Sequence, residues 1–145
     1  MRTRAASRGF TLMEMLVVIV LMSIAVGLLG FGLQRGLRAA DERQAVGQMV
    51  DALRATRVNA IITGQPSTTV FDLRRRLFQA PGQPLRHWPA DLQVRLQTAA
   101  GVGSAVEFYP DGGSTGGNLL LSNAHRRWRI DINWLTGDVR SRSLP

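Results

Sequence analysis

A glycine and an acidic residue mark the start of a long apolar segment near the amino terminus. Gly9 stands directly before Phe10, and Glu14 lies four residues further on. Residues 15–33, which follow, carry no charge. A carboxylate at membrane depth costs on the order of 3 kcal/mol or more unless it is paired or near the interface. Glu14 is therefore the first candidate for a functional side chain, and ion pairing is the chemistry it would perform.

The apolar segment that positions Glu14 is long enough to cross a membrane. At about 1.5 Å per residue, a helix from Phe10 to Leu33 measures roughly 36 Å, and a hydrocarbon core is about 30 Å thick. Arginines flank the segment on both sides, with Arg2, Arg4 and Arg8 before it and Arg35 and Arg38 after it. This distribution favours a cytoplasmic amino terminus only weakly. We predict a membrane span over residues 10–33.

The apolar segment could also belong to one of two more common classes. A secretory signal peptide would use the same arginines as its basic region and would be cut near residues 25–27, but its apolar core usually has about 7 to 15 residues and this one is longer. An ordinary single-pass anchor would carry Glu14 without any function. The spacing of Gly9, Phe10 and Glu14 argues against both classes.

The sequence Phe-Thr-Leu-Met-Glu from Phe10 to Glu14, behind Gly9 and a short arginine-bearing leader, resembles the class III signal of type IV pilins and type II secretion pseudopilins. In that family a membrane-embedded prepilin peptidase cuts after the glycine and methylates the new amino terminus. The resemblance implies cleavage between Gly9 and Phe10. Residues 1–9 would be the leader, and Phe10 would become the N-methylated first residue.

The same resemblance implies a role for Glu14 in filament assembly. An α-amino group has a reference pKa of about 8 and is mostly cationic in water. The new amine of Phe10 and the carboxylate of Glu14 would therefore both face a desolvation cost inside a filament. Pairing the amine of one subunit with the carboxylate of its neighbour offsets both costs and fixes the axial register.

Length and composition limit the rest of the chain. Its 145 residues suffice for one small domain in addition to the anchor. The absence of cysteine excludes disulfides, thiolate metal sites and cysteine nucleophiles. The net charge is +8, and removing the leader would take away three arginines and leave about +5.

Helical periodicity continues beyond the apolar segment. Residues 37–63 lack proline, and one stripe at the 3.6-residue period contains Val46, Met49, Val50, Leu53, Ala60 and Ile61. A single helix of roughly 80 Å is expected from Phe10 to Thr63. Gly64 and Pro66 are its predicted stop.

Two charged residues interrupt the apolar stripe. Glu42 and Arg57 lie on the same face and must reach solvent or find partners. The second half of the helix, residues 34–64, is expected on the periplasmic side of the membrane. Residues 65–145 are expected to form a β-rich globular domain.

From Ser67 onward the apolar period changes to two, which is typical of half-buried antiparallel strands. Apolar residues alternate with polar ones at Leu92, Val94 and Leu96 and again at Trp128, Ile130, Ile132 and Trp134. Further strands are predicted at residues 68–73, 106–109, 118–122 and 138–142. The helix stripe can cover their apolar faces. The predicted fold class is α+β, a long amino-terminal helix packed on a small antiparallel β-sandwich, as in type IV pilins.

A glycine-rich loop from Pro110 to Gly117 lies between two predicted strands. A phosphate cradle would need Gly-Lys-Ser/Thr at the start of a helix, and the chain has no lysine. Its glycines therefore fit a tight turn with positive φ. Together with Phe108, Tyr109 and residues 136–140, the loop is similar to the carboxy-terminal signature of the H group of minor pseudopilins, which includes the FimT and FimU minor pilins.

Catalytic and metal-binding patterns are weak. His87 and His125 stand alone without a second ligand at metal spacing, and we expect both at the surface or at strand edges. Asp111 is one carboxylate among glycines, whereas calcium needs about six to eight oxygens. Trp128 and Trp134 fit core or inter-sheet packing, with an exposed docking patch as the alternative. We expect no metal, no cofactor and no enzymatic activity.

Arginine clusters form the last candidate site. They contain Arg74, Arg75 and Arg76, then Arg126, Arg127 and Arg129, and finally Arg140 and Arg142. Such patches can bind the DNA backbone, and in the related FimT minor pilins a Gly-Arg-x-Arg tail motif is associated with DNA capture. Here an acidic residue and a valine separate Gly137 from Arg140. We favour arginines that solvate strands or meet acidic neighbours, and keep Arg140 and Arg142 as DNA contacts for the alternative function only.

The resemblance as a whole implies a minor pseudopilin of a type II secretion system, located near the tip of a periplasmic filament that helps to export folded proteins. Its expected partners are the prepilin peptidase, the major and other minor pseudopilins, the inner-membrane assembly platform and inner-membrane lipid. A FimT- or FimU-like minor pilin acting in pilus assembly or DNA uptake is the alternative. A membrane-anchored periplasmic binding module is a third possibility.

Overall fold

The computed structural model describes residues 11–98 and 103–145, and for residues 28–38 it describes the backbone alone. The predicted cleavage residues Gly9 and Phe10 lie outside these residues. Contacts divide the chain into two compact units, Met1–Ala39 and Ala40–Pro145.

Helix α1 (Leu12–Thr63) is continuous and contributes to both units. It begins after Thr11, whose hydroxyl accepts a hydrogen bond from the Glu14 amide at 3.2 Å. It ends where predicted, since Thr63 is its last residue and Gly64 has a φ of +64°. This left-handed conformation suits glycine at a helix end.

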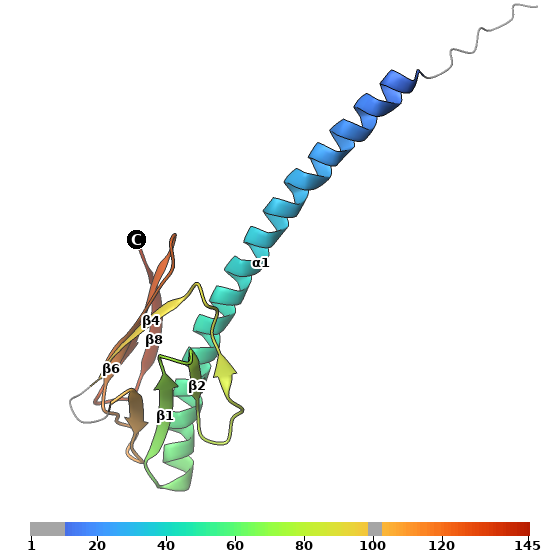
Figure 1. Cartoon of the computed structure of the whole chain (residues 1–145). Coiled ribbons are helices and arrows are strands. Elements are labelled where there is room, and N and C mark those ends of the chain that lie inside the picture. Colours follow the sequence, from blue (N-terminus) through green and yellow to red (C-terminus); the bar gives the residue numbers. More distant parts are fainter. Residues whose placement is uncertain (1–10, 99–102) are drawn as a thin grey trace, which may run out of the picture. The chain divides into compact units, whose positions relative to one another are not determined.

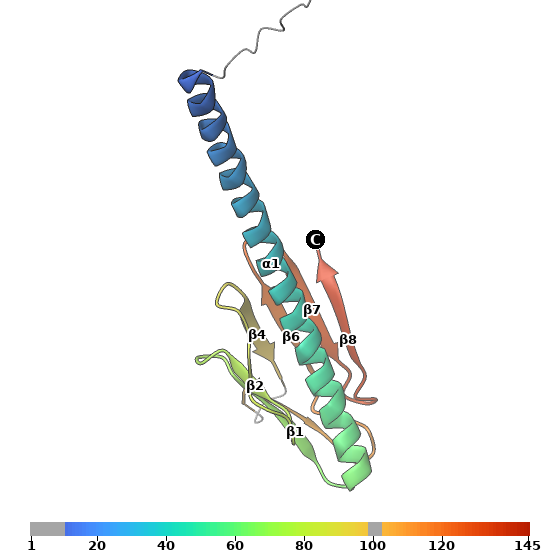
Figure 2. The same cartoon turned by 90° about the vertical axis from the view of Figure 1, so that its right-hand side faces the viewer.

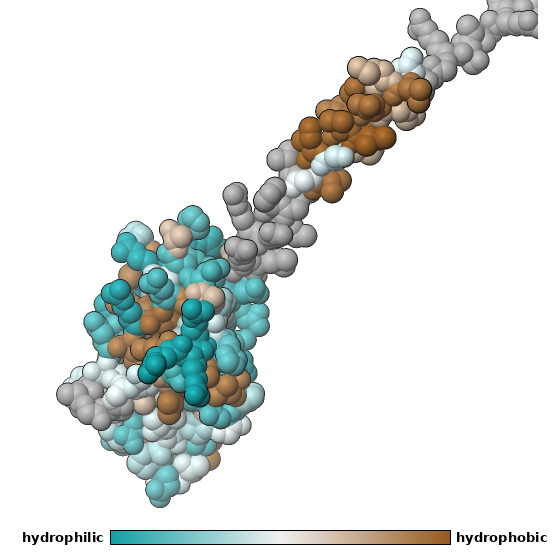
Figure 3. Space-filling model, viewed as in Figure 1, coloured by the Kyte–Doolittle hydropathy of each residue, from teal (hydrophilic) through white to brown (hydrophobic). Residues whose placement is uncertain are grey.

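The first unit presents apolar side chains to solvent. Between Leu12 and Val26 the large apolar side chains are 39% to 93% exposed, and Figure 3 shows this stretch as a hydrophobic surface. Among the residues whose side chains are described, no helical stretch is both long and apolar enough to cross a membrane. The span predicted over residues 10–33 extends beyond these residues and stays a prediction.

The second unit contains two antiparallel four-stranded sheets. The first has the order β3-β2-β1-β5 and the second β4-β6-β7-β8. The strands are β1 (Ser67–Asp72), β2 (Leu77–Gln79), β3 (Arg86–His87), β4 (Gln93–Gln97), β5 (Ala105–Phe108), β6 (Gly117–Ser122), β7 (Arg127–Ile132) and β8 (Val139–Leu144). Figures 1 and 2 show the carboxy-terminal part of α1 running alongside both sheets. The structure thus has the predicted α+β class.

Six predicted strands are confirmed to within about two residues at most boundaries. The prediction missed β2 and β3, which are only three and two residues long. It also extended β7 too far. That strand ends at Ile132, and Trp134 lies in the following turn with 68% exposure. The prediction that Trp134 packs in the core was therefore wrong, whereas Trp128 is buried.

The core lies between the helix stripe and the inner faces of both sheets. Met49, Leu53 and Ala60 are fully buried on the helix, as are Val106 and Phe108 on β5. On the second sheet, buried side chains include Leu119, Leu121, Ile130 and Val139. Ile61 departs from the prediction, since it is 46% exposed in the last turn of the helix.

Polar side chains of α1 bind to the β domain. The fully buried hydroxyl of Thr56 lies 2.6 Å from the hydroxyl of Thr69 on β1. Either of these two hydroxyls can donate the hydrogen bond. Glu42, also buried, accepts a hydrogen bond of 2.6 Å from Asn123. Arg57 donates to the carbonyl of Gly112 at 3.2 Å. Glu42 and Arg57 were predicted to reach solvent or find partners, and both find partners in the β domain.

Candidate functional site

Glu14 lies in the first turn of α1 with its side chain exposed. An acidic residue is favourable there because the amino-terminal end of a helix carries a partial positive charge. Among the side chains of residues 11–27, 39–98 and 103–145, no cationic group lies within 4 Å of its carboxylate, and no hydrogen bond to it is found. The described chain thus leaves the carboxylate accessible to an external cation.

Thr11 adds a residue that was not among the predicted sites. Its hydroxyl and its carbonyl both accept from the Glu14 amide, at 3.2 and 3.1 Å, and the carbonyl also accepts from Met15. Thr11 therefore caps the helix by satisfying amides that have no partner inside it. The spacing Thr-x-x-Glu is a known signal for a helix start and would have predicted this position.

The glycine-rich loop is a set of tight turns between β5 and β6, as predicted. Gly112, Gly116 and Gly117 have φ values of +87°, +69° and +126°, a region that other residues rarely adopt. A Cβ atom on Gly117 would lie 2.3 Å from the carbonyl oxygen of Gln97. Glycine is required there by both conformation and space.

The side chain of Asp111 takes part in this loop. Its Oδ1 accepts a hydrogen bond of 2.9 Å from the amide of Gly113. In the part of the chain that the structure describes, no group of three or more His, Asp or Glu side chains is arranged to hold a metal ion. The carboxylate of Asp111 therefore stabilises the turn at Gly113.

The loop supports the turn between β7 and β8. Ser114 donates from its amide to the carbonyl of Trp134 at 2.8 Å and from its hydroxyl to the carbonyl of Asn133 at 3.0 Å. Within the turn, the side chain of Asn133 accepts from the amides of Leu135 and Thr136. The turn therefore holds Trp134 and Leu135, both about two-thirds exposed, on a well-defined backbone.

The arginines of the carboxy-terminal tail have acidic neighbours within the chain. The Nε atom of Arg140 lies 2.6 Å from Asp138, and Arg142 lies 3.3 Å from Asp131, which also binds Arg129 at 2.5 Å. The side chains of Arg140 and Arg142 are 84% and 61% exposed. Exposed pairs of this kind contribute only about 0–1 kcal/mol. They reduce the local positive charge without removing these arginines from the surface.

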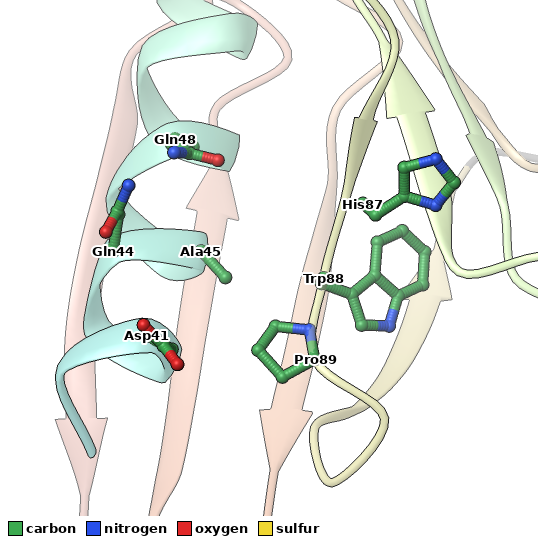
Figure 4. A pocket seen from close by; sticks show the side chains of 7 residues that line it. All are labelled: Asp41, Gln44, Ala45, Gln48, His87, Trp88 and Pro89. Carbon is green, nitrogen blue, oxygen red and sulfur yellow. The ribbon is translucent and has the colours of Figure 1, made fainter. Parts of the chain in front are cut away.

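A polar groove of about 430 Å³ lies between α1 and β3. Figure 4 shows Asp41, Gln44 and Gln48 of the helix on one side and His87 with Trp88 on the other. His87 is exposed on its short strand, and His125 is exposed in the β6–β7 turn, as predicted. The groove contains no nucleophile, and among its described residues one His and one Asp do not form a catalytic arrangement.

Comparison with protein families matches two parts of the chain. A model described as type II transport protein GspH matches residues 45–137. A model described as prokaryotic N-terminal methylation motif matches residues 4–30. The first match covers the buried half of α1 and most of the β domain. The second contains Gly9, Phe10 and Glu14.

Individual proteins show the same similarity. Type II secretion system protein H of Xanthomonas campestris pv. campestris is 40% identical over 146 residues, which cover 97% of this chain and 86% of that protein. Among solved structures, the minor pseudopilin EpsH from the type 2 secretion system of Vibrio cholerae has a TM-score of 0.59 at 14% identity, covering 71% of this chain and 97% of that chain. At this identity, the structural match supports the fold.

Proposed function

Because this chain belongs to the GspH family of type II transport proteins, we propose that it is a minor pseudopilin, a structural subunit of a type II secretion filament. The observation that carries the proposal is the presence of two family signatures in one chain. The methylation motif covers residues 4–30, and the GspH model covers residues 45–137. The filament subunit would have a structural role and no enzymatic activity of its own.

The amino-terminal segment would be processed and anchored as in other pilin-like proteins. A prepilin peptidase would cut between Gly9 and Phe10 and methylate Phe10. The apolar stretch up to Leu33 would hold the subunit in the inner membrane, with residues 34–145 in the periplasm. The exposed apolar side chains between Leu12 and Val26 support this role, because such a surface is stable in lipid or against other apolar helices.

Glu14 would pair with the methylated amine of a neighbouring subunit in the filament. The support is its exposure in the first turn of α1, together with the absence of a cationic partner in the described chain. A positive amine beside this carboxylate would remove the cost of burying either charge alone. The remaining partners would be the major pseudopilin, other minor pseudopilins and the inner-membrane assembly platform.

Intact mass spectrometry of the protein from its native host tests the processing step. The expected mass is that of a chain beginning at Phe10 with one added methyl group. A Gly9→Val variant should keep its leader, because the peptidase recognises the glycine. A native product that begins near residue 28 would instead identify a conventional secretory signal and contradict the proposal.

A DNA-binding assay separates the proposed role from that of a DNA-uptake minor pilin. The ion pairs of Arg140 and Arg142 with Asp138 and Asp131 favour the secretion role, because part of their charge is already compensated. The full chain in detergent should bind duplex DNA only weakly at physiological salt. Tight, steeply salt-dependent binding that disappears in an Arg140→Ala/Arg142→Ala variant would favour DNA uptake.

A further inference from the structure

A second cavity, of about 350 Å³, lies between the β1–β2 turn of the first sheet and strand β4 at the edge of the second. Residues of the β1–β2 turn, the segment after β3 and strand β4 line it. Two of its lining residues are Arg76 and Arg95, and Gln93 adds an amide. No acidic side chain is among its described lining residues. The cavity therefore combines positive charge with an amide that can donate a hydrogen bond.

Nearby acidic groups do not neutralise these two arginines. Within residues 11–98 and 103–145, neither Arg76 nor Arg95 has a carboxylate within 4 Å. Asp72 pairs with Arg75 at 3.8 Å and accepts from the amides of Arg74 and Arg75. The tail arginines differ, since Arg140 and Arg142 both have in-chain partners. The positive charge of the cavity is therefore uncompensated, whereas that of the carboxy-terminal tail is partly compensated by acidic residues.

The backbone holds Arg76 in an unusual conformation. Its φ is +57°, which makes it the one non-glycine residue with positive φ in the described chain. Asparagine or glycine adopts this region more readily than arginine does. Its carbonyl accepts a hydrogen bond from the amide of Trp88 at 3.2 Å, which ties the turn to another wall of the cavity. The local fold accepts arginine at a position where another residue would be more stable.

Apolar groups complete the cavity beside the charges. Leu73, Val94 and Trp88 are among its lining residues. Figure 3 shows strongly hydrophilic surface over the β1–β2 hairpin with hydrophobic surface next to it. A carboxylate on an aliphatic stem matches this combination, because the stem contacts the apolar wall while the guanidinium groups bind the oxygens. A free phosphate group would use only the charges.

Strand β4 offers free backbone groups beside the cavity. It is the edge strand of the second sheet and pairs with β6 on one side only, among the described residues. An extended segment can add to such an edge through main-chain hydrogen bonds, while pockets for its side chains provide specificity. Gln93, Val94 and Arg95 belong to this strand and also line the cavity.

We propose that the cavity between Arg76 and Arg95 binds a glutamate or aspartate side chain of an extended segment from another filament subunit. The two arginines would hold the carboxylate, and the segment would lie along the free edge of β4. Only the source of the segment rests on the proposed function. The chemistry of the cavity is independent of it.

A peptide-binding measurement on the full chain in detergent micelles tests the chemistry. The probe is a fluorescein-labelled hexapeptide of alternating glutamate and valine. We expect binding that weakens as salt rises, and a loss of about threefold to fivefold in affinity for both Arg76→Asn and Arg95→Gln, because both arginines are exposed. Asparagine suits the conformation of residue 76, so unfolding cannot explain its loss. Arg140→Gln is the matched control and should change the affinity less than about twofold.

Three different results of this measurement would overturn the proposal. Equal losses in Arg140→Gln and Arg76→Asn would show non-specific attraction to positive charge. A peptide of alternating lysine and valine that binds equally well would exclude carboxylate recognition. Tighter binding of a thymidine oligonucleotide, or displacement by equimolar inorganic phosphate, would assign the arginines to a phosphate group.

Photo-crosslinking in the native host tests the source of the segment. A benzoylphenylalanine at Leu73, which is 37% exposed beside the cavity, should crosslink to an acidic peptide of another pilin-like subunit. The same cells report cleavage after Gly9. A processed chain that assembles normally but crosslinks only to lipid would overturn the pocket and leave the proposed function intact. An unprocessed chain that still binds the peptide would contradict the proposed function and leave the pocket intact.

Discussion

The two halves of α1 differ in the exposure of their apolar side chains. Between Leu12 and Val26, large apolar side chains point to solvent all around the helix, with exposures from 39% to 93%. Between Ala45 and Ala60 most apolar side chains are buried, and Met49 and Leu53 are fully buried against the sheets, whereas Val58 is 50% exposed. A helix that is apolar on every side needs surroundings supplied by lipid or other helices. An amphipathic helix needs only the sheets of its own chain.

Two carboxylates of α1, one in each half, differ in the same way in their exposure and hydrogen bonding. Glu42 is 7% exposed and accepts a hydrogen bond from Asn123 of its own chain. Glu14 is exposed and has no such partner among the described residues. Burial within the chain therefore stabilises the second half of α1, whereas the side chains of Leu12–Val26 have no comparable burial among the described residues.

Truncating one leucine in each half should give the largest difference. Leu53→Ala leaves a cavity in the core and should cost about 2–5 kcal/mol of unfolding free energy. Leu21→Ala, at a side chain that is 60% exposed, should change it by less than about 0.5 kcal/mol. Thermal unfolding of the full chain in detergent, followed by the fluorescence of its tryptophans, measures both. Equal losses of unfolding free energy in the two variants would mean that both halves of the helix contribute alike to the stability of the domain.

Removing the two carboxylates should separate stability from assembly. Glu42→Ala leaves the amide of Asn123 without its acceptor and should cost about 1–3 kcal/mol, whereas Glu42→Gln should cost less. Glu14→Ala should leave unfolding of the domain unchanged and allow leader cleavage, yet reduce co-purification with partner subunits. Undiminished co-purification of Glu14→Ala would refute the pairing role.

The helix start should be sensitive to its cap. Thr11→Ala removes the hydroxyl that binds the Glu14 amide and should destabilise the first turn by about 1 kcal/mol. Hydrogen exchange at the Glu14 amide should then speed up about fivefold, with no change in the second unit. Ser23→Ala is the control, since that hydroxyl binds the Ile19 carbonyl within the helix. An equal effect of both changes would argue against capping.

Truncating a side chain at the end of the buried stripe should have only a small effect on stability. Ile61→Ala should cost about 1 kcal/mol or less, because the side chain is 46% exposed. The same tryptophan fluorescence assay can compare it with Leu53→Ala. A loss as large as that of Leu53→Ala would show that the buried half of the helix continues to its last turn.

The sequence predicted the helix, its end and most strands because these depend on local signals. The apolar periodicity of the helix and the strands can be read directly from the sequence. So can the end of the helix, which Gly64 and Pro66 mark. Trp134 was misassigned because the alternation continues past the end of β7, although Asn133 and Gly137 are turn residues that could have indicated it. Strands β2 and β3 are too short to show a period.

The candidate sites divide in the same way. The place of Glu14 in the first turn of α1 and the tight turns of the glycine loop could be predicted from spacing. The pairs of Arg140 and Arg142 with acidic residues depend on strand register, and the cavity at Arg76 and Arg95 brings together residues that are 19 positions apart. No pattern along the chain contains this information, because it arises only when the two sheets form.

The polar bonds between α1 and the β domain also have a mechanical consequence. Glu42 binds Asn123, Arg54 donates to the carbonyl of Val139, and Arg57 donates to that of Gly112. The outer two helix residues are 15 positions apart, which is about 22 Å along the axis. Force applied along the Ala40–Thr63 part of the helix would be shared by these bonds and by the hydroxyl contact of Thr56 with Thr69, so that no single bond carries all of it. Separating this part of the helix from the sheets would therefore require several bonds to break together.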